Sequence, residues 1–483
     1  MTAALARRPP RVARRAPDES TVDPTATQRG PRATEVGALT TLALALIWSH
    51  DEPERVGEVF VLPPDARGLA FTVGRSAEPD PDGAVPLSLR RLRPHASEVR
   101  GPFESGRVSR RQLRIVPGGP DEITVELVGR GTLAINGHPS QRALCRPGDI
   151  IEVSDRFMLL LTRRPLDWPG GPAWAQDFAF GTADRHGIVG ESPAAWSMRT
   201  QLAFLAARDE HVLVVGPSGS GKELAVQAIH AASRRTGRPL IARNAATIPE
   251  TLIDAELFGN LKNYPNPGTP DRPGLLGEAD ESSLFLDEIG ELSHDLQARL
   301  LRVMDRGEYQ RLGEARTRTT RLRMLAATNR EPALLKHDVL ARFPHRLRVP
   351  GFGERREDIA LIARHLLRVS ATADAQHIEQ FFADDEPRLC SRFVLALTRH
   401  EYTTETRELR ELLWRAVAAS PASHLITPPG LVTPPAPPPR PPTPIHASCR
   451  ATRSCTCWRA AAACASGPGA SSASAAAISS SAS

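Results

Sequence analysis

The sequence predicts a multidomain protein: an all-β sandwich, then an α/β domain with a small helical subdomain, and disordered segments at both ends. With 483 residues, the chain exceeds the roughly 100–200 residues of one domain. Short apolar runs separated by turns fill residues 40–163, and longer helical patterns alternate with apolar strands after residue 187. The expected boundaries are a basic arm at 1–35, the sandwich at 36–164, a linker at 165–185, the α/β domain at 186–367, the helical subdomain at 368–420 and a disordered tail at 421–483.

The composition is typical of a cytoplasmic protein that does not cross a membrane. Lys and Arg (61) exceed Asp and Glu (55) by six. The longest apolar run, Gly37–Trp48, is shorter than the ~20 residues of a membrane-spanning helix. Five arginines in the first 15 residues precede polar chain rather than an apolar signal segment, so we interpret them as a solvated arm or, alternatively, a contact for a polyanion. The six cysteines lack the paired spacing of a zinc site.

The sandwich prediction depends on short strands bounded by turn residues such as Asn136-Gly137. The expected strands are 42–48, 58–62, 70–73, 112–116, 123–128, 132–135 and 157–162. The pattern then changes to helices, which we expect at 201–207, 223–234, 295–306, 359–369, 392–398 and 406–418.

A phosphate-binding loop follows the apolar run Val212–Val215 and precedes a helical pattern. Backbone amides freed by its glycines turn toward phosphates, the helix N-terminus adds partial positive charge, and Lys222 reaches the outer phosphates. The expected ATP-binding residues are Gly216, Pro217, Ser218, Gly219, Ser220, Gly221, Lys222 and Glu223. Because Glu223 replaces the usual Ser or Thr, one direct Mg²⁺ ligand is missing.

Two carboxylates end the apolar run 284–286, and a polar pair ends the run 324–327. We expect Asp287 to hold Mg²⁺ through water, Glu288 to polarise the attacking water and Asn329 to sense the γ-phosphate. ATP hydrolysis is the predicted chemistry.

Residues 187–418 resemble the AAA+ domain of sigma-54-dependent transcription activators. The matching runs are IVG at 188–190, the phosphate loop ending in Lys-Glu, ELFG at 256–259, LFLDEIGEL at 284–292, LLRV at 300–303, AATNR at 326–330, ERREDI at 354–359 and REL at 407–409. The resemblance implies that Asn244 restrains the catalytic glutamate and that Val189 and Arg407 contact nucleotide. It also implies that Lys336 and Arg342 reach the ATP of a neighbouring subunit, so that hydrolysis requires a homo-oligomeric ring.

Three features differ from that family. Its GAFTGA loop, which contacts sigma-54, is replaced by NYPNPG at 263–268. The lid reads TTET at 403–406 where the family has PGNV. No helix-turn-helix for specific DNA binding is visible after Ala418, where the chain becomes rich in Pro and then in Ala, Ser and Cys. One hypothesis for this tail is an out-of-frame product.

The N-terminal region resembles forkhead-associated (FHA) domains, which bind phosphothreonine peptides through loops at one end of a β-sandwich. Gly74-Arg75, Ser109-Arg110, Asn136-Gly137 and the PGD run at 147–149 carry the resemblance. Arg75 and Arg110 supply charge-assisted bonds to phosphate, and Ser109 and Asn136 supply directional donors. Gln112 stands where the family usually has a histidine that supports the loop.

The sequence therefore predicts an ATP-hydrolysing regulator of the sigma-54 activator type, controlled by a phosphothreonine-containing partner or by its own phosphorylated segment. RNA polymerase with sigma-54 is the implied partner. The alternative is a phosphopeptide-binding scaffold whose AAA+ domain is a nucleotide switch and does not remodel sigma-54.

Overall fold

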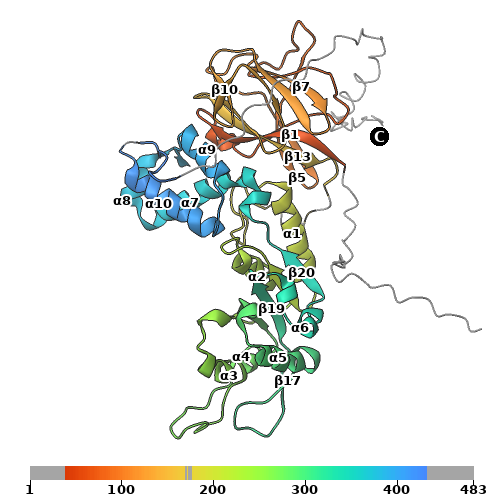
Figure 1. Cartoon of the computed structure of the whole chain (residues 1–483), viewed down its shortest axis with the longest axis vertical. Coiled ribbons are helices and arrows are strands. Elements are labelled where there is room, and N and C mark those ends of the chain that lie inside the picture. The colour runs from red at the N-terminus through yellow and green to blue at the C-terminus, as the bar shows by residue number, and fades with distance from the viewer. Residues whose placement is uncertain (1–38, 169–170, 172–176, 422, 432–483) are drawn as a thin grey trace, which may run out of the picture. The chain divides into compact units, whose positions relative to one another are not determined.

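The computed structural model describes residues 39–168, 171, 177–421 and 423–431 (Figure 1). The predicted basic arm, and the predicted tail apart from 421 and 423–431, lie outside the described residues. All described residues belong to one unit that extends to Pro441. Among them, no helix is both long and apolar enough to cross a bilayer.

The N-terminal part is a β-sandwich of two sheets, one with strand order β10-β9-β12-β13-β1-β2-β5-β6 and one with order β11-β8-β7-β3-β4. The first contains β1 (Thr40–Ser49), β2 (Val59–Val61), β5 (Leu89–Arg93), β6 (Ala96–Gly101), β9 (Leu133–Ile135), β10 (His138–Ser140), β12 (Ile150–Val153) and β13 (Phe157–Pro165). The second contains β3 (Phe71–Val73), β4 (Val85–Pro86), β7 (Leu113–Gly119), β8 (Glu122–Leu127) and β11 (Arg142–Cys145).

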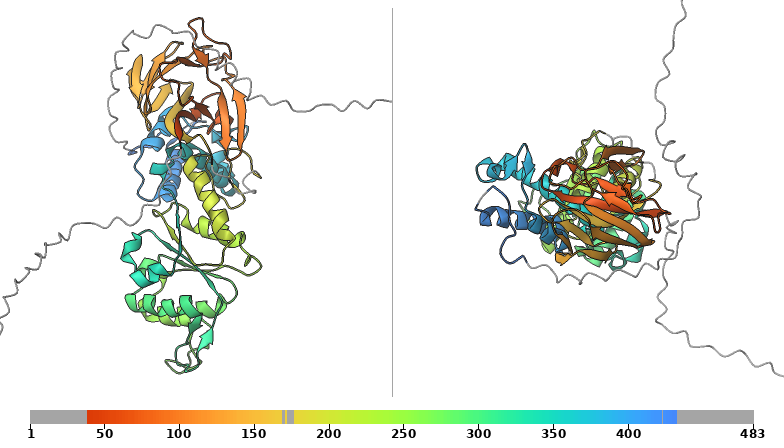
Figure 2. Two further views of the ribbon diagram at one scale, coloured as in Figure 1. Left: turned by 90° about the vertical axis from the view of Figure 1, so that its right-hand side faces the viewer. Right: turned by 90° about the horizontal axis from the view of Figure 1, so that it is seen from above.

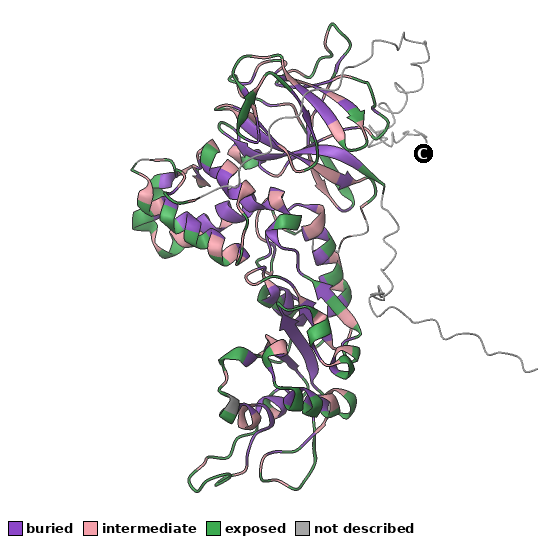
Figure 3. Ribbon diagram, in the orientation of Figure 1, coloured by how far each residue is buried: buried purple, intermediate pink, exposed green. Residues whose placement is uncertain are grey.

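Alternating side chains build the core between the two sheets. Along β7, Leu113 and Ile115 are buried while Arg114 and Val116 are only half-buried, as period-two alternation requires. Phe103 and Phe157 stack in the core with ring centroids 4.5 Å apart. Figure 3 shows the resulting burial along the strands.

Strand β1 is buried on both faces. Leu42, Leu44 and Leu46 point into the sandwich, and a register irregularity between Leu46 and Trp48 interrupts its pairing with β13. Ile47 and Trp48 instead join a second apolar cluster with helices α7 (Ile359–Ala373), α9 (Ser391–Arg399) and α10 (Glu405–Ala419). Helices α7 and α9 lie against β1 (Figures 1 and 2). The outer face of the sandwich therefore shares a core with the helical subdomain.

The α/β domain has a five-stranded parallel sheet of order β15-β16-β19-β14-β20. Its strands are β14 (Val212–Val215), β15 (Ile241–Asn244), β16 (Ser283–Asp287), β19 (Arg323–Thr328) and β20 (His345–Arg348). Its helices are α1 (Pro193–Ala206), α2 (Lys222–Ala231), α3 (Glu250–Phe258), α4 (Leu275–Glu278), α5 (His294–Arg306) and α6 (His337–Ala341). A two-stranded hairpin, β17 (Glu308–Tyr309) and β18 (Arg318–Thr319), follows α5.

The helical subdomain also contains α8 (Ala375–Ile378) and the hairpin β21 (Phe382–Ala383) and β22 (Glu386–Pro387). All seven expected strands and all six expected helices overlap observed elements. Strand β5 was not expected because three of its five residues are arginines. Strand β5 forms because β2 and β6 on either side supply its backbone hydrogen bonds. The buried Glu58 also supplies a negative charge, which pairs with Arg91 at 3.0 Å.

Candidate nucleotide site and phosphate-binding loops

The phosphate loop connects β14 to α2 at the carboxyl end of the parallel sheet. Gly219 and Gly221 have φ angles of 77° and 102°, a left-handed backbone that favours glycine. Gly216 lies so close to β20 that a Cβ atom there would be 2.7 Å from the Val349 carbonyl oxygen. Glycine is therefore required at 219 and 221 by the backbone angle and at 216 by the close approach of β20. Together the three glycines let the loop curve inward.

Lys222 is the first residue of α2, and its side chain folds back over the loop. Its Nζ donates to the carbonyl oxygens of Gly216 and Pro217, at 3.1 Å each. Burial lowers the pKa of Lys222, while the nearby Glu288 and Asp287 raise it. Ser220 Oγ is buried and has no hydrogen-bond partner among the described residues. A buried ammonium and an unpartnered hydroxyl beside curved backbone are groups that phosphate oxygens can satisfy, so the loop fits a nucleotide.

The catalytic candidates meet at the neighbouring strand ends. β16 ends in Asp287, whose Oδ1 accepts the Glu288 amide at 3.0 Å. Glu288 has a φ of 54°, and its Oε2 accepts the amide of Asn329 at 3.3 Å, just after β19. The second oxygen of Asp287 accepts no hydrogen bond from the described residues and is available to a hydrated cation. Asp287 thus fits the predicted Mg²⁺ role, and the structure brings the two carboxylates and Asn329 together.

Asn244 ends β15 opposite Asp287 in the sheet register. Its Oδ1 accepts the amide of Ala246 at 2.9 Å and so caps the short turn that follows. Among the described residues, the Glu288 carboxylate is bonded by the Asn329 amide and has no hydrogen bond to Asn244. Restraint of Glu288 by Asn244 therefore stays a prediction.

The N-terminus of α10 lies on the phosphate loop. Arg407 donates to Ser218 Oγ at 3.4 Å, and the amide of Thr406 donates to Gly219 O at 3.3 Å. The approach is so close that a Cβ on Gly219 would be 2.2 Å from the Thr404 carbonyl oxygen. Arg407 thus lies beside the loop, and Val189 is buried in the apolar cluster shared with α7. Contact of either residue with nucleotide stays a prediction.

Glu408 secures the start of α10. It accepts the Thr403 and Thr404 amides at 2.7 and 3.2 Å and contacts His400 Nε2 at 2.6 Å. Burial acts to raise the pKa of Glu408, but these hydrogen bonds outweigh it and hold that pKa at about 2. The TTET run therefore still builds an ordered helix start.

Arg355 is a residue of the site that the sequence analysis did not select. It is buried, and its guanidinium donates to the Ser220 carbonyl oxygen at 3.1 Å from the rear of the loop. Burial lowers the pKa of Arg355. Its position within the ERREDI run, which carries the family resemblance, is the sequence feature that could have pointed to Arg355.

Residues 188–349 match the family model described as the Sigma-54 interaction domain. This segment is therefore similar to the Sigma-54 interaction domain. The chain is 42% identical over 190 residues to the Nif-specific regulatory protein of Bradyrhizobium diazoefficiens, a match that covers 38% of this chain and 33% of the relative. It is 37% identical over 246 residues to the transcriptional regulatory protein ZraR of Salmonella typhimurium, covering 49% and 53%.

It is also 37% identical over 257 residues to the anaerobic nitric oxide reductase transcription regulator NorR of Escherichia coli, covering 49% of this chain and 47% of the relative. A solved structure of NtrX from Brucella abortus in complex with ATP aligns with a TM-score of 0.43 and 26% identity, covering 48% of this chain and 52% of that chain. The chain thus spans about half the length, or less, of the curated relatives it matches.

Lys336 and Arg342, within the matched segment, flank the short helix α6. Lys336 is half-buried, and its amide donates to Gln297 Oε1 at 3.3 Å. Arg342 is exposed, and its guanidinium forms an ion pair with Asp305 on α5. No hydrogen bond or ion pair in the described part of the chain connects either residue to its own phosphate loop. Action on a neighbouring subunit stays a prediction for both.

The loop that replaces GAFTGA contacts the loop between β17 and β18. Gly313 of the hairpin is so close to the Tyr264 ring that a Cβ there would be 2.7 Å from it. Arg311 pairs with Asp271 and also donates to the Asn260 carbonyl oxygen. The matched segment therefore presents a short loop that contacts a second loop at this position.

In the sandwich, Ser109 is the centre of a loop cluster at one end. Its carbonyl oxygen accepts the Arg75 amide at 3.1 Å, and its Oγ accepts the Arg130 amide at 3.1 Å. Gln112 is buried and connects both sides, because it accepts the Ser109 amide at 3.0 Å and donates to Arg130 O at 2.7 Å. Gln112 thus supports the loop at the position where FHA domains usually have histidine.

Glycine permits the closest approach within this cluster. A Cβ on Gly74 would be 2.3 Å from the Arg110 carbonyl oxygen. Arg75, Arg110 and Arg130 are exposed, and none has an ion-pair partner within the described residues. The neighbouring Arg111, in contrast, pairs with Asp80 at 2.7 Å. The cluster therefore combines a hydroxyl with three uncompensated positive charges.

Asn136 is not part of this cluster. Asn136 and Gly137 have φ angles of 54° and 86° and form the tight turn between β9 and β10, at the end of β9 away from Ser109. The Asn136 side chain is buried; it donates to Asp149 at 2.8 Å and accepts the Ile150 amide at 2.9 Å. The motif that we expected to bind phosphate builds a hairpin here, and Arg130 takes its place beside Ser109.

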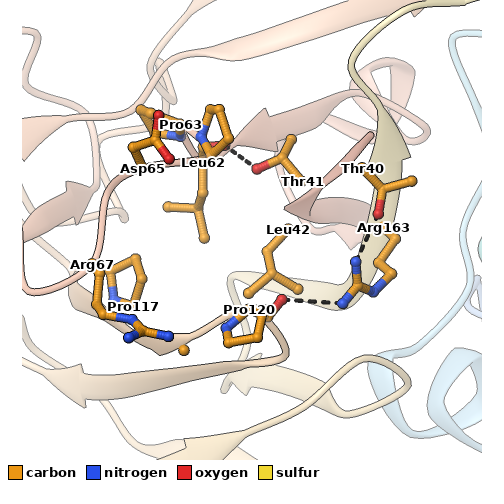
Figure 4. Close-up of a pocket in the computed structure, with 12 residues that line it drawn as sticks. Thr40, Thr41, Leu42, Leu62, Pro63, Asp65, Arg67, Pro117, Pro120 and Arg163 are labelled. Carbon is orange, nitrogen blue, oxygen red and sulfur yellow. Dashed lines mark hydrogen bonds between the residues drawn. The ribbon is translucent and has the colours of Figure 1, made fainter. Parts of the chain in front are cut away.

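A pocket of about 330 Å³ opens at the opposite end of the sandwich (Figure 4). It is lined by residues at the start of β1, just after β2 and at the far end of β7, including Thr40, Leu62 and Pro117. This pocket is therefore separate from the Ser109 cluster.

A buried ion pair joins the sandwich to the segment that precedes α7. Arg164 donates to both oxygens of Glu357 at 3.0 and 2.6 Å, and the side chains are only 3% and 9% exposed. Next along the chain, Asp358 accepts the Glu191 and Ser192 amides at the start of α1. Because Arg355 contacts the phosphate loop, one short segment connects the sandwich, α1 and the nucleotide site.

Proposed function

We propose that this protein is an ATP-hydrolysing transcription regulator of the sigma-54 activator type, in which the sandwich binds a phosphothreonine peptide and thereby controls the ATPase. The observation that carries the ATPase proposal is the joint placement of Lys222, Asp287, Glu288 and Asn329 around a loop with an unpartnered Ser220 hydroxyl.

The residues divide the chemistry between binding and proton handling. Lys222 and the loop amides hold the phosphates, and Arg407 reaches the loop from the helical subdomain. Glu288 is fixed by the Asn329 amide, where it can orient a water molecule and accept its proton. When bound, Mg²⁺ supplies charge neutralisation for the phosphates, and Asp287 is the residue that would hold it through water.

ATP turnover by the full chain, measured against protein concentration, tests this proposal. We expect a rate per subunit that rises with concentration, because Lys336 and Arg342 are proposed to complete the site of a neighbouring subunit in a ring. Glu288→Gln should abolish turnover while ATP still binds. Glu291→Gln is the matched control, because Glu291 lies three residues away and pairs with Arg330 at 2.6 Å. Equal turnover by the Glu288 and Glu291 variants would refute the catalytic assignment.

Control by a phosphopeptide is supported by the Ser109 cluster and by the ion pair of Arg164 with Glu357. Arg75, Ser109 and Arg110 provide charge and a hydroxyl for one phosphate. We expect phosphothreonine peptides to bind the full chain and to change its ATP turnover. Ser109→Ala should weaken binding, whereas peptide binding that is unchanged in this variant would argue against the cluster.

A phosphopeptide-binding scaffold with a nucleotide switch is the second candidate. It is favoured by the loop at 263–268, where Tyr264 packs on Gly313, and by the engagement of Arg342 with Asp305. Replacing residues 263–268 by GAFTGA and assaying open-complex formation at a sigma-54 promoter separates the two. Transcription by the parent chain would exclude the scaffold. ATP binding without turnover at any concentration would favour it.

A further inference from the structure

The Ser109 cluster carries more positive charge than one phosphate requires. A phosphothreonine has a charge of about −1.5 to −2 near neutral pH. Arg75 and Arg110 already match that charge. Arg130 remains, and its side chain makes no ion pair within the described residues. Asp51 accepts the Ser105 hydroxyl and Asp80 pairs with Arg111, so neither carboxylate compensates Arg130 in the described structure.

A fourth arginine lies over Gly131, the residue that follows Arg130. Arg156, in the turn between β12 and β13, donates from Nε to the Arg107 carbonyl oxygen at 2.7 Å. This bond leaves the terminal nitrogens of Arg156 free to point elsewhere. Its Nη1 lies over Gly131, so close that a Cβ on Gly131 would be 1.9 Å away. Gly131 also has a φ of 112°, which a side chain would strain.

Because Gly131 has no side chain, the Arg156 guanidinium can lie directly over it, one residue after Arg130. Asp155 precedes Arg156 in the chain, but no ion pair between them occurs in the described part of the protein. Arg130 and Arg156 thus form a two-arginine patch on adjacent loops. It is separate from the pair Arg75 and Arg110 but is joined to it through the hydrogen bond of the Arg130 amide to Ser109 Oγ.

We propose that Arg130 and Arg156 form a second anion subsite, which selects phosphothreonine peptides that carry another negative group near the phosphothreonine. This inference rests on the proposed phosphopeptide function and specifies its ligand. The shared chemistry is a compact anion that accepts hydrogen bonds from two guanidinium groups. A second phosphate or a cluster of carboxylates can supply it.

Fluorescence anisotropy with the full chain and four labelled peptides tests the subsite. One peptide has a single phosphothreonine and neutral flanks, one adds three aspartates, one adds a second phosphothreonine, and one has the aspartates without phosphate. We expect the two peptides with added charge on the phosphothreonine background to bind about tenfold more tightly than the neutral one at low salt, and this advantage should shrink as salt rises. The unphosphorylated acidic peptide should bind least.

The double variant Arg130→Gln/Arg156→Gln should bring all phosphothreonine peptides to within about twofold of one another. Arg67→Gln/Arg146→Gln removes the same charge at the other end of the sandwich and should keep the preference. The single variant Arg130→Gln controls for misfolding, because the Arg130 side chain makes no hydrogen bond or ion pair in the described structure. It should lose part of the preference for acidic peptides.

The result separates the two proposals. Equal affinity of the parent chain for neutral and acidic phosphothreonine peptides would overturn the subsite and leave phosphopeptide binding intact. A preference retained in the Arg130/Arg156 variant would also overturn it. Absence of binding by every phosphothreonine peptide would instead refute the proposed function of the sandwich.

Discussion

Removing the carboxylate of Glu357 should strongly destabilise the protein, because Arg164 would then be buried without a partner. The two side chains are 3% and 9% exposed and share two hydrogen bonds. Loss of one partner of such a buried pair costs about 3–5 kcal/mol, whereas exposed pairs contribute about 0–1 kcal/mol. We therefore expect Glu357→Ala to lower the free energy of unfolding by about 3 kcal/mol or more.

The adjacent arginine provides a matched control. Arg163 pairs with Asp121, and these side chains are 37% and 59% exposed. Asp121→Ala should therefore cost less than about 1 kcal/mol. The double variant Arg164→Met/Glu357→Leu should recover most of the loss, because no buried charge remains unpaired.

Urea unfolding of the full chain, followed by tryptophan fluorescence, measures these effects. Trp48 lies in the apolar cluster beside this ion pair and donates to the Leu389 carbonyl oxygen at 2.7 Å, so its environment reports on the same contact. If Glu357→Ala costs no more than Asp121→Ala, the ion pair is exposed to solvent in solution. The reasoning that connects the sandwich to the nucleotide site would then fail.

Three further outcomes follow from the contacts. Gly219→Ala should reduce ATP affinity about tenfold or more in a nucleotide-binding assay, because its Cβ would strike the Thr404 carbonyl and its φ is positive; unchanged affinity would contradict the closed loop. Gly74→Ala should destabilise the loop by about 1–3 kcal/mol and weaken phosphopeptide binding, which calorimetry and anisotropy would detect. Because its folded pKa is depressed, Glu408 stabilises the fold above pH 4.5 and loses this effect as pH falls toward 2; thermal unfolding should show Glu408→Gln less stable at pH 7 and equal to the parent near pH 2.

Local motifs were predictable because adjacent residues carry their chemistry. The phosphate loop needs only a buried strand, glycines with unusual φ angles and a helix start, and all of these lie within residues 212–231. Asp287 and Glu288 follow a strand for the same reason. Strand β5 and Arg130 escaped prediction because their neighbours in space, not in sequence, determine what they do.

The sequence alone therefore determined the order of the domains, the nucleotide loop and the carboxylates at the end of β16, since backbone preferences and apolar periodicity act over short stretches. Tertiary packing decided which residues share a site. It turned Asn136 into a hairpin residue, brought Arg130 to Ser109 and buried Arg164 against Glu357, 193 residues away. Such contacts depend on how sheets and helices pack, and no local pattern encodes that packing.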